Sequence, residues 1–122
     1  MPGYQSSAPV LLANTFAVAA PADQNRVNDF EYDSDTEEIT IHGNFEQNMM
    51  YYIMVYYGSE YDNWGRSLLQ PVNASQIVVD DRDMMYQGAP TRVVMYAIEN
   101  VDDIGGGNWA AEIRYIGQAT NP

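Results

Sequence analysis

Carboxylates are the reactive side chains that this sequence supplies in quantity, with 17 Asp and Glu residues among 122. The tightest group is Asp80, Asp81 and Asp83, which a turn would bring close together. Hard cations such as Ca²⁺ and Mg²⁺ prefer several carboxylate oxygens at short range. These three residues are therefore the candidate ligands of a structural Ca²⁺ or Mg²⁺ ion, and the sequence predicts no other cofactor.

A second acidic run alternates along residues 29–37. On one extended strand its five acids share a face, while Phe30 and Tyr32 point the other way: Asp29, Glu31, Asp33, Asp35 and Glu37. Alternate residues of a strand lie about 6.6 to 7 Å apart, too far for all five acids to reach a single ion. We expect a solvated acidic face here rather than a metal site.

The sequence gives little support to catalysis. His42 is the only histidine, and the chain has neither cysteine for a thiolate nor lysine for a Schiff base. Two carboxylates about 5 to 9.5 Å apart could hydrolyse a glycoside, but among so many acids no pair stands out. We expect a protein that is not an enzyme.

The balance of charges indicates a protein adapted to a hypersaline environment. Five arginines and no lysine leave a formal net charge of -12. Salt near 1 M shortens the screening length to about 3 Å, so such a chain can stay compact and hydrated in brine. We expect a halophilic protein, the alternative being a merely acidic protein from a mesophile. Nucleic acid is not an expected partner, because phosphate binding needs clustered cations, and no apolar run is long enough to span a membrane.

The spacing of apolar residues favours strands. Met49–Tyr57 and Thr91–Glu99 are apolar on both faces, as in strands that are central or pressed against another subunit. Asp102–Gly107 is a predicted turn. Trp109–Ile116 alternates, with these side chains predicted to face inward: Trp109, Ala111, Ile113 and Tyr115. The fold class is thus all-β, a single antiparallel β-sandwich or small barrel of seven to eight strands.

The first 22 residues differ in composition from the rest. Met1–Ala22 contains three prolines and no charged side chain. We expect an extended N-terminal arm over residues 1–22, with one short strand, and a β-sandwich domain over residues 23–122. The apolar residues of the arm that we expect to contact a neighbouring subunit are Val10, Leu11, Leu12 and Phe16.

Gly58–Arg66 reads as a loop that carries Tyr61 and Trp64 beside polar side chains. Flat aromatic faces with polar neighbours suit a partner protein or a sugar ring, and they can also fold back onto a core. Tyr61 and Trp64 are therefore further candidate partner-binding residues.

A small all-β domain with an uncharged arm resembles the decoration, or cement, proteins on capsids of tailed viruses. The resemblance is carried by Met1–Ala22 and the strand pattern, and other virion components such as a small capsid, turret or tail protein fit as well. It implies a structural assembly protein located in the virion, a homo-oligomer bound to other capsid subunits, and the absence of lysine suggests a halophilic host. The alternative is a secreted, extracellular carbohydrate-binding or adhesive β-domain that uses Tyr61 and Trp64.

Overall fold

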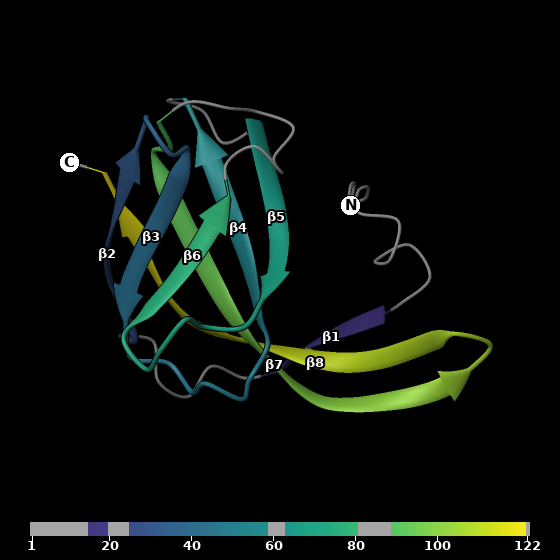
Figure 1. Cartoon of the computed structure of the whole chain (residues 1–122). Helices are drawn as coiled ribbons and strands as arrows, with labels where there is room; N and C mark the ends of the chain where they lie inside the picture. Colours follow the sequence, from purple (N-terminus) through teal and green to yellow (C-terminus); the bar gives the residue numbers. More distant parts are fainter. Residues whose placement is uncertain (1–14, 20–24, 59–62, 81–88, 122) are drawn as a thin grey trace.

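The computed structural model describes residues 15–19, 25–58, 63–80 and 89–121, and within these ranges the chain is all-β. Eight strands form two sheets that pack face to face (Figure 1). The predicted single β-sandwich of seven to eight strands is therefore confirmed.

The larger sheet has the strand order β1-β8-β7-β4-β5 and the smaller sheet the order β2-β3-β6. All neighbouring strands are antiparallel except β1, which runs parallel to β8. The strands of the larger sheet are β1 (Thr15–Ala19), β4 (Tyr51–Tyr57), β5 (Asn63–Leu69), β7 (Arg92–Gly105) and β8 (Asn108–Thr120). The smaller sheet contains β2 (Val27–Asp33), β3 (Glu38–Gly43) and β6 (Gln76–Asp80).

The core lies between the two sheets and is built from alternate residues of their strands. The smaller sheet contributes Ile39 and Ile41 of β3 together with Ile77 and Val79 of β6, all fully buried. The larger sheet contributes the fully buried side chains Tyr51, Ile53, Val55, Val93 and Met95. This period of two is what a strand with one face inward requires, and β4 is central, between β7 and β5.

Tyr51 closes one end of the core through hydrogen bonds. Its buried hydroxyl accepts from Arg26 Nη2 at 3.1 Å and from the Glu46 N–H at 2.9 Å. Arg26 Nε also donates to the Asn44 carbonyl at 2.8 Å. Beside this network a Cβ on Gly43 would lie 2.2 Å from the Arg26 carbonyl oxygen, so only glycine fits there.

The strands β7 and β8 continue past the sandwich as a long hairpin, and β1 lies along β8 on it (Figure 1). The turn predicted over Asp102–Gly107 is shorter than expected, because β7 continues through Gly105. Gly105, Gly106 and Gly107 have φ values of 90°, 65° and 79°, which side chains rarely tolerate. These glycines confine the reversal to the end of the hairpin.

Two other sequence predictions are corrected by the pairing of strands. Residues 29–37 do not form one extended strand, because the chain reverses after Asp33 and returns as β3. The side chain of Asp33 stabilises this reversal by accepting the N–H groups of Asp35 and Thr36 at 2.8 and 3.3 Å. The predicted loop Gly58–Arg66 is also partly a strand, since Asn63 to Arg66 belong to β5 and pair with β4.

Candidate interaction surface

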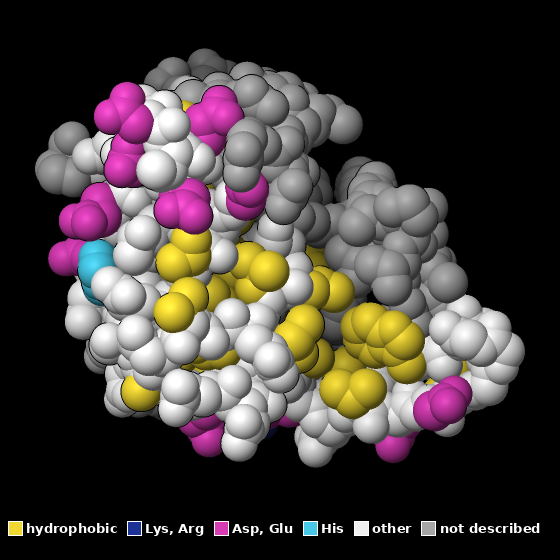
Figure 2. Space-filling view, in the orientation of Figure 1, with side chains coloured by type: hydrophobic (Ala, Val, Ile, Leu, Met, Phe, Trp, Pro, Cys, Tyr) yellow, Lys and Arg dark blue, Asp and Glu magenta, His cyan; other side chains and the backbone are white. Residues whose placement is uncertain are grey.

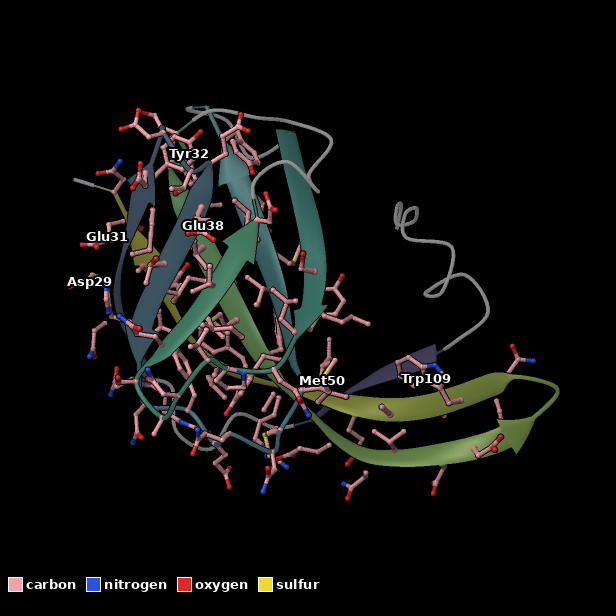
Figure 3. The ribbon with its side chains drawn as sticks, in the orientation of Figure 1. Asp29, Glu31, Tyr32, Glu38, Met50 and Trp109 are labelled. Carbon is pink, nitrogen blue, oxygen red and sulfur yellow. The ribbon has the colours of Figure 1, made fainter. Side chains whose placement is uncertain are left out.

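The outer face of the three-stranded sheet is acidic. Asp33 lies directly opposite Glu38 across the β2–β3 pair, and Glu38 lies directly opposite Asp80 across the β3–β6 pair. These three residues form a row across the sheet, which we call the acidic row. Figure 3 shows Asp29, Glu31 and Glu38 on this sheet, and with Asp80 of β6 the acidic face extends over all three strands rather than one.

A hollow of about 450 Å³ lies over this face, lined by acidic and hydroxyl side chains that include Glu31, Tyr32 and Thr36. His42 Nε2 lies 3.8 Å from Glu31 Oε1 at its edge. Within the described part of the chain, no three His, Asp or Glu side chains are placed to hold one metal ion. Of the predicted metal ligands, Asp80 ends β6, whereas Asp81 and Asp83 lie outside the described residues, so the ion remains a prediction.

The outer face of the five-stranded sheet is apolar and aromatic. Its centre is a row of tyrosines, with the rings of Tyr52 and Tyr96 5.9 Å apart and those of Tyr96 and Tyr115 5.8 Å apart, both edge to face. Burial raises the pKa of the Tyr96 hydroxyl, and the nearby tyrosine hydroxyls, that of Tyr56 first, raise it further.

The same outer face continues along the hairpin as a second hydrophobic cluster. It consists of Tyr52, Ile98 and Ala111, with these partly buried side chains packed against them: Met54, Leu68, Tyr96, Trp109 and Ile113. The side chains Trp109, Ala111 and Ile113, predicted to face inward, thus belong to this second cluster and not to the core between the sheets. Among the strands that the structure describes, none covers this face.

An apolar groove of about 380 Å³ lies where the hairpin leaves the sandwich, lined mainly by Met50, Leu68, Ile98, Val101 and Trp109. We call it the hairpin groove. Met50 is 37% and Val101 60% exposed, so apolar surface remains open to solvent here. Figure 2 shows hydrophobic side chains running from the sandwich onto the hairpin; most of the visible acidic side chains gather at the opposite end of the molecule, and a few lie on the hairpin. Figure 3 shows Met50 and Trp109 on the two sides of this junction.

Polar contacts fix the hairpin at its base, on the side opposite the cluster. Arg114 Nε donates to Glu99 Oε1 at 2.8 Å, and both side chains are about three-quarters buried. The Asn100 amide also donates to Glu112. Charge-assisted hydrogen bonds of this kind fix side-chain positions better than exposed ion pairs do. The hairpin that borders the groove is therefore held in one position at its base.

The predicted partner-binding residues are only partly placed. Val10, Leu11, Leu12 and Tyr61 lie outside the described residues. Phe16 lies in β1, in register with Ala111 of the second cluster. Trp64 lies in β5, paired with Tyr56. The register thus places Phe16 of β1 beside Ala111 of β8, whereas Trp64 sits in an edge strand and not in a loop.

Sequence reasoning did not identify the residues of the hairpin groove. The available signal was that Met49–Tyr57 and Thr91–Glu99 are apolar on both faces, which means that the sheet needs a cover on each side. Val101 was missed because it adjoins the run Asp102–Gly107, whose acids and glycines indicate a turn.

Comparison of the chain with known protein families, with curated proteins and with solved structures finds no match. Within the described ranges, the chain has no helix that could cross a membrane. Its function must therefore be inferred from its own residues.

Proposed function

We propose that this chain is a non-enzymatic structural assembly protein that binds neighbouring protein subunits through the outer face of its five-stranded sheet. A virion component of a hypersaline environment, such as a capsid decoration or minor capsid protein, is the setting that we propose. The observation that carries the proposal is the contrast between the two outer faces, one acidic and one apolar with an open groove.

The apolar face supports this proposal because exposed hydrophobic patches with a polar surround are typical of protein contacts. Tyr, Trp and Met are also enriched at interface cores, and the second cluster contains all three residue types. The acidic row supports a saline setting, since like charges directly opposite one another on a sheet repel unless salt screens them.

Native mass at high salt tests the proposal, with a matched pair of variants. Val101 lies in the hairpin groove and Val72 lies outside it, yet each is 60% exposed, so a charge at either position should leave folding intact. We expect the wild type to exceed the chain mass of 13.7 kDa. Val101→Asp should reduce the association and Val72→Asp should not.

Two results would overturn the proposal. The first is a wild type that stays monomeric at every salt concentration and does not bind capsid subunits. The second is a monomer that binds glycans and loses this binding in Trp64→Ala, which would instead establish the carbohydrate-binding alternative.

A further inference from the structure

The size and the lining residues of the hairpin groove indicate what kind of segment would bind there. Its volume of about 380 Å³ falls within the range of about 300 to 1,000 Å³ that is usual for binding pockets. Three of the four large hydrophobic side chains exposed in the described residues, Met50, Val101 and Ile104, lie in the groove or on the hairpin beside it. Asp103 also lines the groove, so an apolar occupant without negative charge is favoured.

The chain itself contains one long stretch of that kind. Met1–Ala22 has no charged side chain, and it includes three consecutive aliphatic residues, Val10, Leu11 and Leu12. The rest of the chain carries all 17 acids against five arginines. Much of the remaining surface of a second copy would therefore bring negative charge toward Asp103, whereas this segment brings none.

The direction of β1 indicates whether the N-terminal segment reaches the hairpin groove of its own copy or that of a second copy. β1 begins at Thr15, in register with Ala110, and runs parallel to β8 toward the sandwich. β1 therefore begins near the end of the hairpin, since the turn Gly105–Asn108 lies only a few residues past Ala110. A chain that continued backward from β1 in this direction would reach the turn within a few residues and then run beyond the hairpin, away from the sandwich.

The length of the segment is sufficient for it to reach another molecule. The 14 residues that precede Thr15 can span up to roughly 46 to 50 Å when extended. A return into the groove of the same copy would instead need the chain to reverse between Leu12 and Thr15, where Asn14 is the one residue of a type common in turns.

We infer that residues 10–12 of one copy bind in the hairpin groove of a second copy, so that the N-terminal segment links protomers. This inference rests on the proposed function, and it names both the partner and the receiving site. Reciprocal exchange between two copies closes a dimer, and transfer from each copy to the next forms an open chain or a ring.

The absence of cysteine from the chain allows a direct test. Leu11→Cys and Val101→Cys are prepared separately, mixed at high salt and treated with a mild oxidant. One of the two is labelled with ¹⁵N, so that mass spectrometry separates mixed disulfides from pairs of identical chains. Val72→Cys replaces Val101→Cys in the matched control, because both valines are equally exposed.

We expect the mixed disulfide Leu11→Cys with Val101→Cys to form severalfold more than Leu11→Cys with Val72→Cys. Equal yields in the two mixtures would overturn the inference. An intrachain disulfide in the dilute double variant, without mixed dimers, would also overturn it, since each segment would then occupy its own groove.

The native mass of the wild type is measured in parallel and separates the two proposals. An oligomer without the Leu11 and Val101 cross-link contradicts the groove inference and leaves the assembly function standing. A monomer without the cross-link contradicts the groove inference, and it contradicts the assembly function as well if the chain also fails to bind capsid subunits.

Discussion

Removing the central charge of the acidic row should stabilise the fold, and should do so most at low salt. Glu38 lies between Asp33 and Asp80, directly opposite both. Glu38→Gln removes both repulsions and keeps the shape of the side chain. The gain in the free energy of unfolding therefore measures the repulsion within the row.

The size of the gain follows from the strand geometry. Directly opposite side chains on antiparallel strands lie about 5 Å apart, where two unit charges in water repel by about 0.8 kcal/mol. Screening lengths of about 8 Å at 0.15 M salt and about 3 Å at 1 M reduce this to roughly 0.45 and 0.15 kcal/mol per pair. For two pairs, Glu38→Gln should gain about 0.9 kcal/mol at 0.15 M and about 0.3 kcal/mol at 1 M.

Thermal unfolding at the two salt concentrations measures the effect. About 0.9 kcal/mol corresponds to a rise in Tm of roughly 3 to 4 °C for a domain of this size, falling to roughly 1 °C at 1 M salt. Asp102→Asn is the control, because it removes the same charge from a position whose cross-strand partner is Ala110. The reasoning is refuted if Glu38→Gln gains no more than Asp102→Asn, or if its gain persists undiminished at 1 M.

Three further substitutions test the core, the end of the sandwich and the tyrosine row. Ile53→Ala, at a fully buried position of β4, should lower the free energy of unfolding by about 2 to 5 kcal/mol in equilibrium denaturation. Gly43→Ala should lower it by about 1 to 3 kcal/mol, because the new Cβ would meet the Arg26 carbonyl oxygen at 2.2 Å. Burial and then Tyr56 raise the pKa of Tyr96, so the folded chain keeps this proton to higher pH than the unfolded chain does. Stability should therefore fall as the pH rises above about 10, and Tyr96→Phe should lessen this fall in a series of melting curves.

The sandwich could be predicted because strand spacing is a local property of the sequence. The apolar runs around Ile53 and Met95 and the turns between them determine how many strands the chain forms. Residues 29–37 were nevertheless expected as one strand, because their alternation of acids continues through a local reversal. Alternation alone does not reveal a reversal, which here depends on the Asp33 side chain accepting backbone N–H groups.

The candidate surface was less predictable than the fold, since its residues come from distant parts of the chain. Met50, Leu68, Ile98 and Trp109 meet only after the order of the strands in the larger sheet is set. The sequence does show that β4 is apolar on both faces. It does not show which face meets the other sheet, because that depends on the register of long-range pairs.

Because the acidic and the apolar outer faces are separate, salt should have two different effects on this protein. Within one chain, salt screens the acidic row, an effect that does not depend on protein concentration. Between chains, salt screens the electrostatic repulsion of molecules that each carry a net charge of -12. This repulsion must be overcome before the apolar faces can meet. A salt titration at two protein concentrations therefore separates the effects: the unfolding of the monomer should shift equally at both, while association at a given salt should rise with concentration. If salt strengthens association in Val101→Asp as it does in the wild type, the hairpin groove is not where the chains meet.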